Sequence, residues 1–404
     1  MDNHPNFVFL LTDDQENVPD EGTPGMRYTF PMMREFGTTL QNFFSNVPIC
    51  CPSRTTLFTG RYPHRWFVPR DDACMHMNVS SQDFANANMG VNMKQYGYTT
   101  GCFGKTLNFE LKTQYCSETS ETAEVFPGWD SSFTLCNEFL FNNNVWNVNG
   151  SMLHTTDYMT SLIGNHSLAF INSRLQSGKP FFAYIGVHAP HLYSEPAPWY
   201  KDEFPDLVAP QTPNFNFSGS THHYLGAGHS RRRKTALCGQ HIVDVLPTII
   251  ELAGGVVPMS MDGHSFANEL KNGNNSTLFR TKHLVELEQL FEYPMECELF
   301  DLNKDKEQMW NLCGVPEAHI QGDLNRVRVE LRDHLHSQIH CSGQIECVFS
   351  MVVKVIRAEA TSKNMGCQSR DQLQFAQAKK GDGMSITQAP DSLQEASIRQ
   401  AQNR

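Results

Sequence analysis

The stretch NFVFLLTDD, residues 6–14, is a short apolar run that ends in two aspartates. Such a run, followed at once by polar residues, is typical of a strand buried on both faces of a parallel sheet. The end of this strand would present Asp13 and Asp14 to a loop. Adjacent carboxylates there can bind a hard divalent cation such as Ca²⁺ through oxygen, although an isolated pair is also typical of a solvated turn.

Strand and helix patterns alternate along the chain on either side of other polar segments. Helices are expected in PSRTTLFTGRYP (52–63, with Gly60 as its stop), at the start of VNMKQYGYTTGCFGK (91–105), in DYMTSLIGNHSLAFINSRL (157–175) and in QHIVDVLPTIIELAGG (240–255, with a glycine C-cap). Strands are expected before Lys105 and in KPFFAYIGVHAPH (179–191). This order predicts an α/β fold with a largely parallel sheet. Ligands bind such sheets beyond the carboxyl ends of the strands, where we expect Asp13, Asp14, Lys105, His188 and His191.

The residue pattern and composition of the sequence change towards the C-terminus. ECELFDLNKDKEQMWNL (296–312) reads as a strand, an acidic turn and a helix. We expect a main domain over residues 1–255, a smaller α+β subdomain over 256–347, and a tail over 348–404. That tail is rich in Gln, Ser and Ala and poor in large apolar residues, which predicts disorder or weak helicity.

Composition restricts the partners and the compartment. The net charge of -11 and the pI of 5.8 argue against nonspecific nucleic-acid binding, and the one basic run, SRRRK (230–234), is typical of a solvated loop. Twelve cysteines, with Cys341 and Cys347 spaced for a short disulfide loop, favour a secretory route. N-glycosylation acceptors point the same way: Asn78, Asn149, Asn165, Asn216, Asn274 and Asn275. The run Phe7 to Leu11 is too short for a signal peptide or a membrane span, so we expect neither in this chain.

The adjacent cysteines in CCPSR, residues 50–54, need an explanation. Neighbouring cysteines rarely bond to each other, and their spacing fits neither a zinc pair nor a CxxC redox motif. A thiol at a helix N-terminus near Arg54 would have a lowered pKa and could act as a nucleophile. A buried pair of free cysteines is the simpler alternative.

The longer segment CCPSRTTLFTGRYPH (50–64) resembles the signature of the sulfatase family. PNFVFLLTDDQ, YGYTTGCFGKTLN, KPFFAYIGVHAPHLYSEPAPWY and ELFDLNKDKEQMWNL resemble further family segments, so the resemblance covers residues 5 to 345. CCPSR and GKTLN are most similar to the N-acetylglucosamine-6-sulfatases and related heparan sulfatases. The resemblance implies an alkaline-phosphatase-like sandwich, a sulfuric ester hydrolase of sulfated glycans, most specifically of the 6-O-sulfate of N-acetylglucosamine, and a lysosomal or extracellular location.

The resemblance also implies a role for each site residue. Cys50 would be oxidised to formylglycine by a modifying enzyme that reads Pro52 and Arg54, and its hydrated aldehyde would attack sulfur. Asp13 and Asp14, together with residue 50, would hold Ca²⁺, and Arg54 would steady the hydrate. Lys105 and His191 would bind sulfate oxygens, with His191 also protonating the leaving oxygen; His188 and His64 are further candidates.

One segment of the family pattern is missing. The family has a later strand ending in D-N/H-G, which supplies two more metal ligands and precedes a second lysine. Here, residues 225–240 offer only LGAGHSRRRKTALCGQ, with His222, His223 and Lys234 nearby. We therefore expect a sheet that lacks a strand, and a non-catalytic binder of sulfated glycans is the alternative function. A phosphodiester or phosphonate hydrolase is a third, disfavoured by CCPSR.

Overall fold

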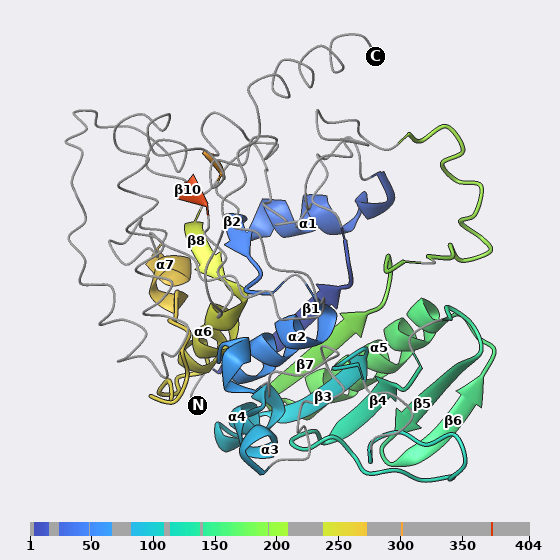
Figure 1. Ribbon diagram of the computed structural model, residues 1–404, viewed down its shortest axis with the longest axis horizontal. Helices are drawn as coiled ribbons and strands as arrows, with labels where there is room; N and C mark the ends of the chain where they lie inside the picture. The colour runs from blue at the N-terminus through green and yellow to red at the C-terminus, as the bar shows by residue number, and fades with distance from the viewer. Residues whose placement is uncertain are drawn as a thin grey trace, which may run out of the picture.

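The computed structural model describes residues 4–15, 24–47, 49–66, 82–108, 114–137, 140–192, 194–208, 237–272, 300–301 and 373–374 (Figure 1). A six-stranded sheet forms the centre of this part of the chain. In spatial order its strands are β1 (Phe7–Thr12), β7 (Phe181–Val187), β3 (Thr99–Gly104), β4 (Ser131–Leu135), β5 (Asn144–Val148) and β6 (Ser151–Thr155). The first four run parallel, and β5 and β6 pair antiparallel. The mostly parallel α/β sheet is thus confirmed.

Helices cover both faces of this sheet. The layer of α2 (Cys50–Thr59), α4 (Met89–Gln95) and α6 (Val245–Leu252) packs on one face, and α5 (Met159–Ser177) packs on the other. The remaining described helices are α1 (Thr29–Phe36), α3 (Gln82–Ala87) and α7 (Ala267–Asn272), with short 3₁₀ turns η2 (Pro24–Met26), η3 (Pro63–Arg65) and η4 (Ile242–Asp244). The helices predicted in 52–63, 157–175 and 240–255 correspond to α2, α5 and α6, and the strands predicted in 6–14 and 179–191 to β1 and β7.

Strand β7 shows why the two layers form. Its alternate residues Phe182 and Tyr184 belong to a core cluster with α2, α4 and α6, while Phe181, Ala183 and Ile185 belong to a second cluster with α5. A continuous apolar strand buried on both faces is what a parallel sheet between two helical layers requires. The flanked sandwich is therefore the observed architecture.

Helix α2 places the cysteine pair at its first turn. Ile49 is its extended N-cap, Pro52 lies in the first turn, and Gly60 ends the helix in the left-handed region, at φ 64°. The Gly60 N–H donates to the Thr56 carbonyl at 2.9 Å. A side chain at position 60 would also press on Met261 and Pro247, so this stop signal is favoured by backbone and packing together.

A small second sheet joins distant parts of the sequence. β2 (Leu40–Phe44) pairs parallel with β8 (Leu237–His241). Beside it, Asn46 Nδ2 lies 2.9 Å from His241 Nδ1, and Asn46 Oδ1 accepts the Val243 N–H at 3.3 Å. Further on, buried Asp262 pairs with Arg65 at 2.9 Å. These contacts hold residues 241–262 against α2 and η3.

Strand β1 lies at the edge of the six-stranded sheet. Among the described residues it pairs only with β7, and Val8 and Leu10 are 52% and 46% exposed. The expected loss of a strand stays a prediction. The segment in question, including His222, His223 and Lys234, lies outside the described residues.

The predicted division of the chain at residues 255 and 347 stays a prediction. Val257 and Met261 pack on the main core, and the two-residue strands β9 (Phe300–Asp301) and β10 (Leu373–Gln374) pair with each other. Of the predicted glycosylation acceptors, Asn149 and Asn165 are exposed. The others, Asn78, Asn216, Asn274 and Asn275, lie outside the described residues, as do Cys341 and Cys347. No helix within the described ranges combines the length and apolarity that a membrane crossing needs.

Candidate active site

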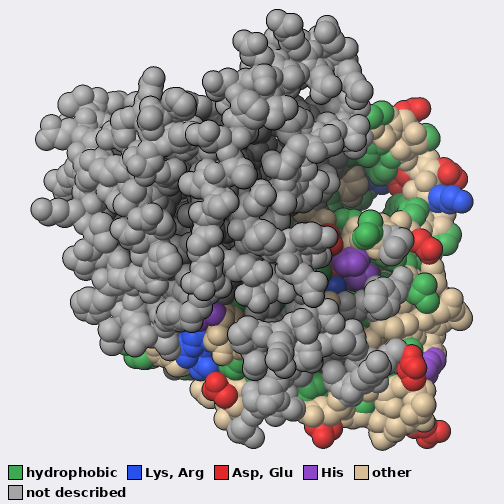
Figure 2. Space-filling view, viewed as in Figure 1, with side chains coloured by type: hydrophobic (Ala, Val, Ile, Leu, Met, Phe, Trp, Pro, Cys, Tyr) green, Lys and Arg blue, Asp and Glu red, His purple; other side chains and the backbone are tan. Residues whose placement is uncertain are grey.

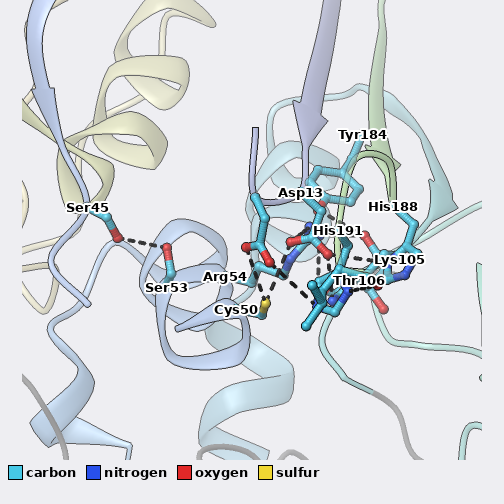
Figure 3. A network of polar contacts seen from close by, with 12 residues as sticks. Asp13, Ser45, Cys50, Ser53, Arg54, Lys105, Thr106, Tyr184, His188 and His191 are labelled. Atoms are coloured by element: carbon cyan, nitrogen blue, oxygen red, sulfur yellow. Dashed lines mark hydrogen bonds and ion pairs between the residues drawn. The ribbon is translucent and has the colours of Figure 1, made fainter. Parts of the chain in front are cut away.

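The carboxyl ends of three parallel strands bring polar side chains to one place. Asp13 follows β1, Lys105 follows β3 and His188 follows β7, and the first turn of α2 adds Cys50. Figure 3 shows these side chains turned toward one another. Six of the residues predicted for the site therefore meet: Asp13, Asp14, Cys50, Arg54, Lys105 and His188, with His191 beside them.

Asp13 is the centre of this network and is 4% exposed. Its Oδ2 accepts from Lys105 Nζ at 2.7 Å and lies 3.3 Å from His188 Nδ1, and its Oδ1 pairs with Arg54 Nη2 at 3.1 Å. Burial alone would raise the pKa of this carboxyl, but the contact with His188 and the charges of Arg54 and Lys105 hold it well below its usual range. Asp13 is therefore a permanent anion between cations.

Arg54 is a buried cation that contacts several groups of the site. Its side chain is 3% exposed, and its Nη1 donates to the Lys105 carbonyl and to Tyr184 Oη, each at 2.9 Å. Tyr184 Oη in turn donates to the same Lys105 carbonyl at 3.1 Å. Burial opposes the charge of Arg54, but Tyr184 and Asp13 nevertheless keep its pKa raised. Arg54 thus ties α2, β1 and the end of β3 together.

Cys50 is a free, partly exposed thiol that faces both aspartates. Its Sγ lies 3.6 Å from Asp13 Oδ1 and 4.0 Å from Asp14 Oδ1. Burial, with Asp13 and Asp14 adding to it against Lys105, raises its pKa to about 11. The lowered pKa expected from the helix N-terminus and Arg54 is therefore wrong. An unmodified thiol here would be protonated at neutral pH and a weak nucleophile.

The two adjacent cysteines differ in bonding state and in exposure. Cys51 is disulfide-bonded and 1% exposed, packed in the core beside α4 and α6, while Cys50 stays reduced at the surface of the site. A second disulfide joins Cys116 to Cys136. Neither a buried free pair nor a bond between neighbours describes residues 50 and 51, because only Cys50 is available for chemistry.

His191 and Asp14 form the open side of the site. His191 Nε2 lies 3.7 Å from Asp14 Oδ2, and the two side chains are 26% and 54% exposed. The ring of His191 stacks on that of buried His188, with centroids 4.6 Å apart. Asp14 has a positive φ of 52°, which turns it away from the strand. Figure 2 shows histidine side chains in a recess that hydrophobic side chains border.

Some buried polar atoms at the site have no hydrogen-bond partner within the described part of the chain. They are Thr106 Oγ1, next to Lys105 in the sequence, and His188 Nε2, whose ring lies beside Asp13. Buried polar atoms are nearly always paired in native structures, so such a group indicates a place where a polar ligand binds. This cluster is suited to an oxyanion.

Two site residues were missed by sequence reasoning, and the candidate His64 stays untested. Thr106 is next to Lys105 in GKTLN, so its position could have suggested it. Tyr184 gives no such signal, because it is one aromatic residue within an apolar strand. His64, in η3, stacks on Tyr62 with ring centroids 5.8 Å apart.

The donor set offers a start for a metal site. Asp13 and Asp14 supply carboxylate oxygens at one strand end, as Ca²⁺ prefers. The charge of Asp13 is already offset by Lys105 and Arg54. In addition, Ca²⁺ takes six to eight oxygen ligands, and the described residues supply only these two carboxylates. Oxygen at position 50 would add one more.

The family model for sulfatases matches residues 5–224. The chain belongs to the sulfatase family. The matched range holds β1 with Asp13, α2 with Cys50, and the strands that carry Lys105, His188 and His191. The alkaline-phosphatase-like architecture inferred from the motifs is thus accounted for by membership of this family.

Sulfatases from animals and algae are among the similar proteins. The chain is 31% identical over 249 residues to the N-acetylglucosamine-6-sulfatase of Homo sapiens, which covers 59% of this chain and 43% of that protein. It is 29% identical over 220 residues to the extracellular sulfatase SULF-1 homolog of Drosophila melanogaster (52% and 19%), and 30% identical over 202 residues to an arylsulfatase of Volvox carteri (47% and 29%). The chain thus spans less than half the length of these relatives.

Solved structures share the fold at low sequence identity. BT4656 in complex with its substrate D-glucosamine-2-N,6-O-disulfate is 14% identical with a TM-score of 0.61, covering 83% of this chain and 97% of that one. The phosphonate monoester hydrolase SpPMH from Silicibacter pomeroyi is 14% identical with a TM-score of 0.53, covering 83% and 96%. Proteins with this fold therefore catalyse more than one reaction, and the reaction of this chain has to be inferred from its site residues.

Proposed function

We propose that the protein hydrolyses sulfate esters of sulfated glycans, with the 6-O-sulfate of N-acetylglucosamine as substrate and residue 50, oxidised to formylglycine, as nucleophile. One observation carries this proposal: Cys50, a free thiol, lies 3.6 Å from Asp13 at the centre of the site, with Lys105 on the far side of that carboxylate. A sulfatase needs its nucleophile and its cations at this place.

The chemistry of position 50 favours oxidation before use. A thiol whose pKa is raised to about 11 reacts poorly at neutral pH. As a hydrated aldehyde, the residue would supply one hydroxyl to attack sulfur and a second whose deprotonation releases sulfate. Pro52 and Arg54, the residues that the modifying enzyme would read, are buried in the folded protein. Conversion must therefore precede folding, and a formylglycine-generating enzyme is the implied partner.

Sulfate binding is assigned to the cationic side of the site. Lys105 is fully buried and held by Asp13, so its ammonium has a fixed position. The first turn of α2 adds the positive end of a helix dipole. His188 Nε2 and Thr106 Oγ1 are unpaired within the described residues and can bind sulfate oxygens. These groups would stabilise the charge that develops on sulfate in the transition state.

His191 is the proposed general acid. Its Nδ1 lies 3.2 Å from the Leu192 carbonyl, which orients the ring, and its Nε2 points to the open side near Asp14. A proton handed from Nε2 to the sugar oxygen would allow the S–O bond to break. Arg54 holds Asp13 and the end of β3, which makes it a positioning residue in this account.

Ca²⁺ is the proposed cofactor, held by Asp13 and Asp14. When bound, it would withdraw electron density from residue 50 and neutralise sulfate oxygens. Its further oxygen ligands would be water, the oxygen of residue 50 and groups outside the described residues.

Substrate class and compartment rest on the relatives. The N-acetylglucosamine-6-sulfatase and the extracellular sulfatase homolog carry these properties in their names. The disulfide between Cys116 and Cys136, and that of Cys51, support an oxidising compartment, hence a lysosomal or extracellular protein. The alternative, a glycan binder without activity, is not favoured by a site in which the predicted residues meet.

Sulfate release tests the proposal. The full chain is produced in secretory cells that contain the formylglycine-generating enzyme, and sulfate is measured from N-acetylglucosamine 6-sulfate and from its 3-sulfate isomer. We expect release from the 6-sulfate, its loss in Cys50→Ala, and a kcat lower by about 10²–10⁴-fold in His191→Gln. Cys102→Ala, which removes the other free thiol of the described residues, is the matched control. Equal release by Cys50→Ala contradicts the proposal.

A further inference from the structure

Three different ligand atoms converge at the mouth of the site. A carboxylate oxygen of Asp13, the Sγ of Cys50 and a ring nitrogen of His191 all lie within 4.8 Å of one another. The Sγ lies 3.6 Å from Asp13 Oδ1. In a tetrahedral zinc site, bonds of about 2.3 Å to sulfur and about 2.1 Å to oxygen place those two atoms about 3.6 Å apart. The pair is thus already spaced as zinc ligands are.

The kinds of donor atom select the ion. Thiolate and imidazole suit Zn²⁺, whereas Ca²⁺ takes oxygen ligands only. We propose that the protein in which Cys50 is still a thiol binds Zn²⁺ through Cys50, His191 and Asp13, and that oxidation of Cys50 removes this site. On binding, the S–H bond breaks, its proton passes to solvent, and a Zn–S bond forms. The modification would then change the metal preference of one pocket from zinc to calcium.

The surrounding charges are compatible with this ligand set. Asp13 Oδ1 already accepts from Arg54 Nη2 at 3.1 Å, but a carboxylate oxygen has two lone pairs and can bind an ion as well. Because Arg54 and Lys105 offset the charge of Asp13, sulfur and imidazole would contribute most of the affinity. This again favours zinc over calcium.

The fourth position lies toward solvent. Among the described residues, Asp14 offers a further ligand, with Oδ1 4.0 Å from Cys50 Sγ and Oδ2 3.7 Å from His191 Nε2. Its side chain is 54% exposed and that of His191 is 26% exposed, so an ion can enter from this side. Asp14 or a water molecule would complete a tetrahedral shell with an open position.

The loss of the site on oxidation rests on the proposed conversion of Cys50 to formylglycine, but the zinc site itself does not depend on the hydrolysis of sulfate esters. It concerns the unconverted chain, which has no formylglycine, and it can hold or fail whichever ester the converted chain cleaves. If it holds, a bound zinc ion would distinguish the unconverted protein from the converted protein.

Cobalt absorbance tests the site. The full chain is produced in an oxidising host that lacks the formylglycine-generating enzyme, freed of metal with a chelator, and titrated with Co²⁺ as a spectroscopic probe. A thiolate bound to Co²⁺ gives a charge-transfer band in the near ultraviolet. We expect this band in the unconverted protein, its loss when Zn²⁺ is added, and its persistence in excess Ca²⁺.

Three variants and one matched protein locate the ligands. Cys50→Ser should abolish the band, His191→Gln should weaken Co²⁺ binding at least about 10-fold, and Cys102→Ala should leave both unchanged. Converted protein, in which residue 50 carries an aldehyde in place of the thiol group, should lack the band. Thermal unfolding checks that each variant is folded. A band that survives in Cys50→Ser, or none in the unconverted protein, overturns the proposal.

Discussion

Replacing Asp13 by asparagine should destabilise the protein far more than the same change at Asp14. Asp13 is 4% exposed and pairs with Arg54 and Lys105, whose side chains are 3% and 0% exposed. The neutral amide would leave these two buried cations without their anion. Removing one partner of a buried pair typically costs about 3–5 kcal/mol, so we expect a loss of unfolding free energy in this range.

Asp14→Asn is the matched control. It removes the neighbouring carboxylate, whose side chain is 54% exposed and whose nearest cation candidate, His191, is 3.7 Å away. Exposed substitutions of this kind change stability by about 0.5 kcal/mol or less. Both variants are compared with the wild type by urea unfolding, followed by tryptophan fluorescence and circular dichroism.

A double variant separates charge from packing. Adding Lys105→Met to Asp13→Asn removes one of the two buried cations that have lost the Asp13 carboxylate. We expect the double variant to recover about 1 kcal/mol or more, because an apolar residue of similar length replaces a buried charge. If Asp13→Asn is as mild as Asp14→Asn, the buried ion cluster is not present and the account of the site is refuted.

Three further predictions follow from the same network. The pKa of Asp13 in the folded state lies below its ordinary value of 3.8, so the stability that its ion pairs supply is present above pH 3.8 and is lost as the pH falls further. In Asp13→Asn, the unfolding free energy should therefore depend less on pH between about pH 2 and pH 5 than in the wild type. In unconverted protein, the pKa of Cys50 is raised to about 11 from an ordinary 9.0, which should slow its alkylation at pH 8 about 100-fold relative to a free cysteine. Cys51 should be alkylated only after its disulfide is reduced. Rapid alkylation of Cys50, followed by mass spectrometry, contradicts this expectation. Tyr184→Phe removes the hydroxyl between Arg54 and the Lys105 carbonyl and should cost about 1–2 kcal/mol, with sulfate release lowered as Lys105 loses its fixed position; a variant as stable as the wild type would speak against this bridge.

The sequence predicted the parts of the fold that local pattern determines. The strands before Asp13 and before His188 are continuous apolar runs that end in polar residues, and the helix that begins at Cys50 ends at a glycine; each is present. Since parallel strands end at the same edge of a sheet, the meeting of Asp13, Lys105 and His188 also followed from the pattern.

What the sequence left undetermined depends on contacts over long separations. The pKa of Cys50 was expected to fall because the helix N-terminus and Arg54 are near in sequence; its burial, and the approach of Asp13 from another strand, raise it instead. The role of Tyr184 depends on where its hydroxyl points inside the core, and the parallel pairing of β2 with β8 joins residues almost 200 positions apart. No local period encodes either.

The mass of the peptide that contains residue 50 shows whether Cys50 is converted to formylglycine, on which the proposed hydrolysis of sulfate esters depends. The chain is produced in secretory cells with the formylglycine-generating enzyme, cleaved without prior reduction of Cys51, and weighed beside the Cys50→Ser protein. We expect residue 50 to be an aldehyde or its hydrate in the wild type, while Cys102 keeps its thiol. A thiol at residue 50 under these conditions contradicts the proposed sulfatase mechanism, because the structure leaves that thiol protonated and weakly nucleophilic.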